Sequence, residues 1–224
     1  MKIKITKDGP YVADTGVPLK EVDYVADRKG AVLGYEETKD HGKGDGETYL
    51  CRCGHSQKKP FCDGHHAKIG FNGTEVSERK PYTACAERVQ GEVYDLLDYP
   101  DLCATGRFCD VGAGFGHALF CSDNASVAYT KKVGDNCPSG RFVLVDKETG
   151  KTLEPELEQE VYLIRDVAAG HYGPIHVRGG IQVTSADGFD YEPRNRVTLC
   201  RCGESGNMPF CDASHLDCPH MKLP

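Results

Sequence analysis

The feature that most constrains this chain is a cysteine-rich motif that occurs twice in its 224 residues. Residues 49–66 read YLCRCGHSQKKPFCDGHH and residues 198–215 read TLCRCGESGNMPFCDASH, so eleven of 18 positions are identical. Both copies have the pattern C-x-C-x2-S-x3-P-x-C-D-x2-H. A chain this size with few apolar residues has a limited core, and small domains of that kind are commonly held by metal sites. The repeat therefore predicts two related halves, each organised around three cysteines and one histidine.

A weaker repeat lies upstream of each cysteine motif. Gly9–Val12 reads GPYV and Gly173–Val177 reads GPIHV, and each is followed by a second Gly-aliphatic pair. We expect each half to be a strand-rich segment that leads into a cysteine loop, with the two halves related by a pseudo-twofold axis. Two copies are too few for a solenoid. The first copy is 15 residues longer between strand and loop, and we place the extra residues in Thr38 to Glu47, which is rich in Gly, Asp and Lys.

Composition excludes several classes of protein. The 27 basic and 34 acidic side chains give a net charge of -7, which is the wrong sign for a nucleic-acid-binding protein. No apolar run approaches the ~18 residues of a membrane span, and the first residues alternate apolar and polar, unlike a signal peptide. We therefore expect a cytoplasmic protein with no nucleic-acid or membrane partner. In a reducing compartment, the 12 cysteines indicate metal or redox chemistry in preference to disulfides.

The spacing of the cysteines favours a two-iron cluster over a single ion. Zinc sites usually draw their first ligand pair from C-x2-4-C, whereas here one residue separates the two cysteines. Two cysteines so close can hold one iron, and the cysteine and histidine four residues apart can hold the second. The predicted ligands, three cysteines and one histidine per cluster, are Cys51, Cys53, Cys62 and His66 in the first copy and Cys200, Cys202, Cys211 and His215 in the second. The alternative is a pair of structural zinc sites.

Three further residue types repeat beside these ligands: Arg52, Ser56 and Asp63 in the first copy, and Arg201, Ser205 and Asp212 in the second. We interpret the two aspartates as helix N-caps that fix the direction of the histidine. Each serine either donates a hydrogen bond to the cluster or closes a turn. Each arginine either offsets the charge of the cluster or is an ordinary solvated side chain.

The motif resembles that of the CDGSH-type iron-sulfur domain, the mitoNEET family. The family signature C-x-C-x2-[ST]-x3-P-x-C-D-G-[SAT]-H differs from the second copy only at Ala213 and from the first only at His65. The resemblance implies one redox-active, acid-labile [2Fe-2S] cluster per motif, set beneath a small β cap. It also implies electron transfer or cluster transfer to a redox partner or an apo iron-sulfur acceptor protein. Two motifs in one chain resemble the monomeric tandem members of the family, so we expect a monomer.

The segment between the motifs has a different character. Gly91–Asp98 and Arg141–Asp146 are typical of strands, and Asp123 and Asn124 are typical of the cap of a helix that continues to about Val133. The spacing C-x5-C with a distant Cys-Pro, at Cys103, Cys109 and Cys137, resembles divergent single-cluster ferredoxins. That resemblance implies a third cluster, [3Fe-4S] or [4Fe-4S], and the alternative is a ferredoxin-like fold that has lost it.

The remaining cysteines and glycines carry less information. Cys121 is either a fourth ligand of this third cluster or, like Cys85 and Cys218, a buried thiol. The glycine-rich run at residues 112–116 lacks the spacing of a nucleotide-binding turn, so we interpret it as a loop.

The sequence thus predicts an α+β protein of small strand-rich domains. Residues 1–80 and 153–224 form two CDGSH-type halves, and residues 81–152 form a ferredoxin-like segment between them. No catalytic motif is present in the sequence, so we expect an electron or cluster carrier and no enzyme. Two alternatives belong to other classes: a zinc-bound interaction module, and a thiol redox enzyme that uses the middle cysteines.

Overall fold

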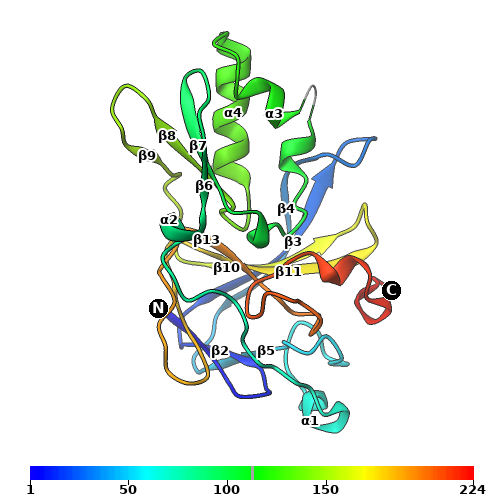
Figure 1. Ribbon diagram of the computed structural model, residues 1–224. Helices are drawn as coiled ribbons and strands as arrows, with labels where there is room; N and C mark the ends of the chain where they lie inside the picture. The colour runs from blue at the N-terminus through cyan, green and yellow to red at the C-terminus, as the bar shows by residue number, and fades with distance from the viewer. Residues whose placement is uncertain (112–113) are drawn as a thin grey trace.

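The computed structural model describes residues 1–111 and 114–224, so two residues of the glycine-rich run lie outside the described part. Strands predominate over helices, and most connections between them are short. The strands of the described residues form three β-sheets, and most of these strands can be followed in Figure 1. The expected α+β class with strand-rich units is confirmed. No helix in the described ranges is both long enough and apolar enough to cross a membrane.

Sheets A and B are each built from both halves of the chain. Sheet A has the order β12-β1-β2-β5, with strands β1 (Lys2–Ile5), β2 (Tyr11–Ala13), β5 (Thr48–Leu50) and β12 (Gln182–Thr184). Sheet B has the order β13-β11-β10-β3-β4, with strands β3 (Pro18–Ala26), β4 (Val32–Lys43), β10 (Val161–Asp166), β11 (His171–Arg178) and β13 (Arg196–Leu199). Sheet B crosses the centre of the molecule, with sheet A on one side (Figure 1).

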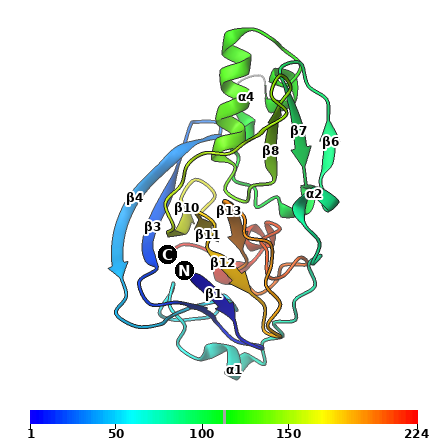
Figure 2. The ribbon, with the colours of Figure 1, turned by 90° about the vertical axis from the view of Figure 1, so that its left-hand side faces the viewer.

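The register of these sheets shows the pseudo-twofold relation. Tyr11 pairs with Leu50 in sheet A, and the equivalent Ile175 pairs with Leu199 in sheet B. One strand of each half joins the sheet that contains the cysteine-motif strand of the other half. Strand β3 of the first half pairs in parallel with β10, and β12 of the second half pairs in parallel with β1 (Figure 2). All other pairings within the two sheets are antiparallel. The exchange explains why neither half forms a complete sheet from its own strands.

One apolar cluster joins the two sheets. Its buried members come from both, and they include Ile3, Tyr11 and Leu50 of sheet A and Leu163 and Leu199 of sheet B. Strands of sheet B such as β13 are buried along their whole length, which is expected where both faces of a sheet are covered. Because each of the largest of these side chains contributes about 1.5–3 kcal/mol on full burial, this core is the principal support of the two cysteine loops that follow β5 and β13.

The extra residues of the first copy form a hairpin and not a loop. Thr38–Lys43, which we expected in the connection, is the second part of the twelve-residue strand β4. The partner strand β3 has nine residues, whereas its counterpart β12 has three. Val22, Tyr24 and Val32 of this hairpin pack on Phe108 of the middle segment. The Gly, Asp and Lys residues did not mark a loop because β4 is an edge strand, where polar and charged residues face solvent.

The middle segment is a third sheet with one helix on it. Sheet C is antiparallel and has the order β6-β7-β8-β9, with strands β6 (Glu87–Val89), β7 (Tyr94–Asp98), β8 (Phe142–Asp146) and β9 (Thr152–Leu153). Helix α4 (Asn124–Asn136) begins after Asp123, whose carboxylate accepts hydrogen bonds from the backbone N–H groups of Ala125 and Ser126. The two predicted strands and the capped helix of this segment are therefore confirmed.

The remaining helical pieces are short. They are α1 (His65–Ile69), α2 (Tyr82–Cys85), α3 (Phe115–Ala118) and four 3-10 turns, at Pro100–Leu102, Phe108–Asp110, Ser214–Leu216 and Pro219–Met221. The 3-10 turn at 100–102 precedes Cys103, the turn at 108–110 contains Cys109, and the turn at 214–216 contains the histidine of the second motif. Short helical turns thus position most of the candidate ligands that do not follow a strand.

Candidate metal centres

Backbone hydrogen bonds fold each cysteine motif back on itself. In the first copy the N–H of Cys51 donates to the carbonyl of Pro60 (2.8 Å), and the N–H of Cys62 donates to the carbonyl of Tyr49 (2.8 Å). The second copy makes the same two bonds, from Cys200 to Pro209 (2.8 Å) and from Cys211 to Thr198 (2.9 Å). These bonds bring the third cysteine and the histidine beside the strand end that carries the first two cysteines.

Within each motif the four candidate ligands lie in two pairs. The sulfur atoms of Cys51 and Cys53 are 4.0 Å apart, and Cys62 Sγ lies 3.4 Å from His66 Nδ1. In the second motif the sulfur atoms of Cys200 and Cys202 are 3.5 Å apart, and Cys211 Sγ lies 3.4 Å from His215 Nδ1. In both motifs the Nδ1 atom faces the cysteine.

This pairwise arrangement fits a binuclear group better than a single ion. A tetrahedral zinc ion needs all its thiolate and imidazole ligands within about 2.0–2.3 Å of one point. Among residues 1–111 and 114–224, no three His, Cys, Asp or Glu side chains come together in such a way. Two separate pairs are what two metal atoms with two protein ligands each require.

The two motifs differ in exposure to solvent. Cys211 and His215 are 2% and 3% exposed, whereas Cys62 and His66 are half-buried. Burial, together with Arg201, lowers the pKa of His215 to about 4, so its imidazole is neutral at physiological pH and available as a ligand. The first motif lies beside α1 at the edge of the molecule (Figure 1), which leaves its cysteine-histidine pair open to water.

The arginine between the first two cysteines of each motif is buried, so the solvated alternative is wrong. Arg52 is 1% exposed and Arg201 is 4% exposed. Arg52 donates to the carbonyls of Thr6 (3.2 Å) and Gly73, and Arg201 donates to the carbonyls of Gly173 (2.5 Å) and Ile164. In the described part of the chain neither arginine takes part in an ion pair with a carboxylate.

A buried guanidinium without a carboxylate is costly unless another negative charge lies near it. The cysteines on either side of each arginine supply that charge once they are thiolates. A thiolate-ligated cluster with a net negative charge therefore fits the surroundings of Arg52 and Arg201. A cationic site would not.

The repeated serines and aspartates close turns within the loop. Ser56 Oγ donates to the carbonyl of Phe61 (2.6 Å) and accepts from the N–H of Lys58 (3.0 Å), and Ser205 makes the equivalent bonds. Asp63 accepts from the N–H groups of Gln57 (2.8 Å) and His65 (3.1 Å). The predicted N-cap role is wrong in one respect. The N-cap of α1 is Gly64, which has a left-handed φ of 81°. The helix therefore begins one residue later than it would if Asp63 were the cap.

Asp212 bridges its loop in the same way, since it accepts from the N–H groups of Gly206 (2.7 Å) and Ser214 (3.0 Å). The residue after it, Ala213, has a left-handed φ of 74°, which matches the conformation of Gly64 in the first copy. The second copy therefore keeps the backbone of the motif without the glycine that favours it.

The two cysteine loops lie back to back. Gly54 has φ +79°, and a Cβ atom there would lie 2.7 Å from the carbonyl oxygen of Cys202. Gly203 has φ +85°, and its Cβ would lie 2.9 Å from the carbonyl oxygen of Cys53. The contact is reciprocal, as expected for two loops related by a pseudo-twofold axis. Glycine is needed at both positions for the backbone angle and for the close approach.

Two histidines that sequence reasoning missed cover this contact. The rings of His55 and His220 stack with their centroids 4.1 Å apart, and His220 Nε2 lies 2.9 Å from the carbonyl oxygen of Cys202. Neither histidine has a spacing to the cysteines that would mark it. The sequence offers one local signal. His55 lies two residues after Cys53, at the position where the second motif has Glu204.

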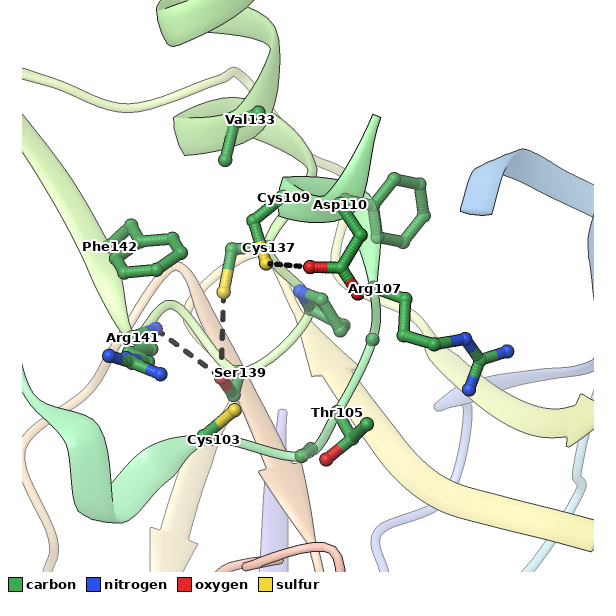
Figure 3. A pocket seen from close by; sticks show the side chains of 14 residues that line it. Cys103, Thr105, Arg107, Cys109, Asp110, Val133, Cys137, Ser139, Arg141 and Phe142 are labelled. Carbon is green, nitrogen blue, oxygen red and sulfur yellow. Dashed lines mark hydrogen bonds between the residues drawn. The ribbon is translucent and has the colours of Figure 1, made fainter. Parts of the chain in front are cut away.

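The three predicted cysteines of the middle segment line one cavity. Its volume is about 250 Å³, and Cys103, Cys109 and Cys137 face it together with Arg107 and Arg141 (Figure 3). Thiolate ligands of a single ion lie about 2.3 Å from it, so three cysteines spread around a space of this size fit a larger group better. Cys121 is half-buried next to His117 and does not line the cavity.

The Cys109 thiol of this cavity is not activated as a nucleophile. Burial and the neighbouring Asp110 carboxylate raise the pKa of Cys109 to about 12, which suppresses its thiolate form at neutral pH. Of the other cysteines, Cys218 is buried against the second motif and Cys85 is half-buried.

The reciprocal glycine contact generates a testable difference between two substitutions. Gly203→Ala adds a left-handed strain of about 1–2 kcal/mol and a steric clash of about 1–3 kcal/mol, so we expect a loss of about 2–5 kcal/mol in the free energy of unfolding. Gly16→Ala is the matched control, since Gly16 has φ +82° but open space around it, and should lose only the strain of about 1–2 kcal/mol. Urea denaturation measures both. Equal losses would show that the loops do not support each other.

Comparison with known proteins agrees with this geometry. Residues 8–67 and 172–216 match the model of one family, described as iron-binding zinc finger, CDGSH type. The searches of curated proteins and of solved structures found no match. The two matched segments contain all eight candidate ligands and the strands that lead to them. The chain therefore contains two CDGSH-type iron-binding segments, one around each cysteine motif.

Proposed function

We propose that the chain binds two [2Fe-2S] clusters, one per motif, and acts in electron transfer or in iron-sulfur cluster transfer to a protein partner. In each motif the first two cysteines would hold one iron, and the cysteine-histidine pair would hold the other. The ligands are Cys51, Cys53, Cys62 and His66 for the first cluster and Cys200, Cys202, Cys211 and His215 for the second. When bound, each cluster supplies a one-electron redox centre.

The observation that carries this proposal is the combination of paired ligands and buried arginines. Pairs of ligands favour two metal atoms over one, which argues against the zinc-bound alternative. Among the described residues Arg52 and Arg201 donate to carbonyls, and Arg52 also to the Met208 sulfur, but neither has a carboxylate partner, so thiolates of the cysteine loops would offset their charge. The raised pKa of Cys109 argues against this thiol as the nucleophile of a thiol redox enzyme.

The difference in exposure suggests different duties for the two motifs. A ligand pair that is open to water can be reached by protons and by an incoming acceptor protein, whereas a buried pair is protected. We therefore assign release of a cluster to the first motif, through Cys62 and His66. The second motif, with Cys211 and His215 buried, would retain its cluster and serve as the stable redox centre.

His66→Cys and His215→Cys test this assignment and act as controls for each other. Replacement of a neutral imidazole by a thiolate adds negative charge, so each variant should keep its cluster, lower the reduction potential of that cluster and resist mild acid better than the parent protein. A chelator should remove iron from the parent in two phases. His66→Cys should slow the fast phase, and His215→Cys should leave that phase unchanged.

Two results would contradict the assignment. If both variants have the potential and the acid sensitivity of the parent, the histidines are not ligands. If iron leaves the parent in a single phase, or if His215→Cys alters the fast phase, the two motifs do not differ as their exposure predicts.

We also propose a third cluster, [3Fe-4S] or [4Fe-4S], held by Cys103, Cys109 and Cys137. The supporting observation is that these three side chains, far apart in sequence, line one cavity of about 250 Å³. Arg107 and Arg141 beside it would offset the charge of the thiolates, although each already pairs with a carboxylate, Asp166 and Asp98 respectively.

Cys137→Ser tests the third cluster. The substitution should remove about three or four irons per chain and leave the iron of the two CDGSH motifs in place. Cys121→Ser is the matched control, because Cys121 is half-buried in the same segment but does not line the cavity. An unchanged iron content in Cys137→Ser would mean that the middle segment binds no cluster.

A further inference from the structure

The middle segment lies against the second cysteine loop. The side-chain amide of Asn207 in that loop donates to the carbonyl of Asp101 in the middle segment (2.8 Å). Phe210, which precedes the third cysteine of the second motif, packs on Tyr82 and Leu102 of the same segment. Part of the second cysteine loop is thus covered by the chain itself.

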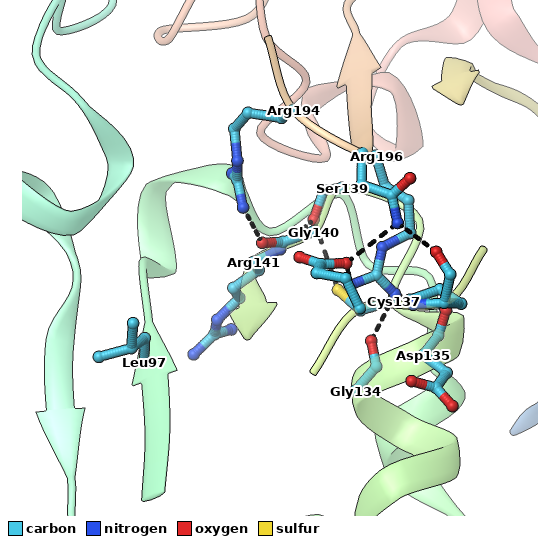
Figure 4. Close-up of polar contacts among 12 residues, drawn as sticks. Leu97, Gly134, Asp135, Cys137, Ser139, Gly140, Arg141, Arg194 and Arg196 are labelled. Atoms are coloured by element: carbon cyan, nitrogen blue, oxygen red, sulfur yellow. Dashed lines mark hydrogen bonds and ion pairs between the residues drawn. The ribbon is translucent and has the colours of Figure 1, made fainter. Parts of the chain in front are cut away.

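Two arginines of the second half hold the middle segment in this place. Arg194 donates to the carbonyl of Gly140, and Arg196 donates to the carbonyls of Gly134 and Asp135 (Figure 4). Because these contacts lie within one chain, the second cysteine loop is covered in every folded molecule.

The first cysteine loop instead exposes apolar side chains beside its open ligand pair. Tyr49 is 49% exposed, and its carbonyl accepts a hydrogen bond from the third cysteine of the motif. Ile69 is 42% exposed and lies three residues after the histidine, on the same short helix α1. The residues at the equivalent positions of the second motif, Thr198 and Cys218, are 1% and 6% exposed. Exposed aromatic and aliphatic side chains of this kind form the centre of many protein interfaces.

The two loops also carry charge of opposite sign. Residues 54–69 contain three lysines and one aspartate, which is a net charge of +2. The equivalent residues 203–218 contain three carboxylates and no lysine or arginine, which is a net charge of -3. The whole chain has a net charge of -7. The first cysteine loop is therefore a basic surface on an acidic protein.

The positive charge of the first loop is available to a partner. Lys58 and Lys68 are exposed, and in the described part of the chain neither these two nor Lys59 forms an ion pair with a carboxylate. Asp63, the one carboxylate among residues 54–69, already accepts hydrogen bonds from two backbone N–H groups. Unpaired lysines around a contact surface steer oppositely charged proteins toward it and increase the rate of association.

We infer that the face of the first cysteine loop formed by Tyr49, Lys58, Lys68 and Ile69 is the docking surface for an acidic face of the protein that accepts the first cluster. The lysines would pair with carboxylates of the acceptor at the rim, and Tyr49 and Ile69 would contact apolar atoms at the centre. The inference rests on the proposed release of a cluster by the first motif, but docking can be measured without any transfer.

The observations favour a protein over a nucleic acid as the occupant. Tight binding to a duplex usually involves 6–10 phosphate contacts, roughly two to three times the number of lysines on this loop. A chain with a net charge of -7 also repels a polyanion over a longer range. The exposed apolar side chains suit the surface of a protein.

Isothermal titration calorimetry of the full chain against a strongly acidic plant-type [2Fe-2S] ferredoxin tests the docking surface. The ferredoxin is loaded with its own cluster, so that no transfer accompanies binding. We expect saturable binding at low ionic strength that weakens severalfold at about 0.15 M salt. Lys58→Glu and Lys68→Glu should each weaken it roughly fivefold. Lys132→Glu is the matched control and should bind as the parent does, because Lys132 is an exposed lysine of α4, at the opposite end of the molecule from α1 (Figure 1).

Transfer of a cluster to the apo form of the same ferredoxin, followed by visible circular dichroism, separates this inference from the proposed function. Lys58→Glu and Lys68→Glu should slow transfer by about the factor by which they weaken binding, while iron leaves for a small chelator at the parent's rate. Binding with the expected dependence on salt and on the two lysines, but without transfer, would support the docking surface and contradict release by the first motif.

Four results would overturn the inference. They are the absence of ferredoxin binding, parental affinity in Lys58→Glu and Lys68→Glu, an equal loss of affinity in Lys132→Glu, and tighter binding of a short double-stranded DNA than of the ferredoxin. The last result would identify the basic loop as a nucleic-acid contact.

Discussion

The rest of the structure depends on the exchange of one strand between the two halves. Because β3 pairs in parallel with β10 and β12 pairs in parallel with β1, each half completes a sheet that the other half begins. The shared core between these sheets then supports both cysteine loops at once. Parallel strands need long connections, and here the cysteine motif and the middle segment are part of those connections.

The exchange also brings the two cysteine loops together. Gly54 approaches the carbonyl of Cys202, Gly203 approaches that of Cys53, and the hydroxyl of Tyr11 in the first half donates to the carbonyl of Cys200 in the second (2.7 Å). Loops in contact in this way support each other. Occupation of one motif should therefore affect the stability of the other, which is a property that two separate domains would lack.

The pseudo-twofold relation holds for the contacts of the two buried arginines but not for the exposure of the two cysteine-histidine pairs. Arg52 and Arg201 donate to carbonyls at equivalent positions: Thr6 directly follows β1, and Ile164 lies within β10. Beyond them, the first cysteine-histidine pair is half-buried and the second is fully buried. The chain thus has two chemically similar sites in different surroundings, and this asymmetry is the basis for assigning release to the first site and retention to the second.

Much of this could be predicted from the sequence, because the motif is a local pattern. The spacing of the cysteines, the cap at Asp123 and the strand Arg141–Asp146 depend on nearby residues, and the structure contains each of the corresponding elements. Burial of Arg52 and Arg201 could not be predicted, since it depends on carbonyls that are distant in sequence.

Contacts with residues that are distant in sequence also explain the other differences between the predictions and the structure. The stretch after Thr38 has the composition of a loop, and only its pairing with β3 makes it a strand. Tyr49 and Thr198 hold equivalent places in the two motifs, and only the surroundings of β5 and β13 make the first exposed and the second buried. The sequence pattern therefore identifies the chemistry of a site, whereas long-range pairing determines what surrounds it.

The most direct test of the central claim is the content of iron, acid-labile sulfide and zinc per chain in protein purified without oxygen, together with its visible spectrum. Two [2Fe-2S] clusters predict about four irons and four sulfides per chain and a coloured protein, and a loaded middle cavity raises the iron to about seven or eight. Two zinc ions per chain in a colourless protein without sulfide would contradict the account, because the paired ligands would then hold single ions.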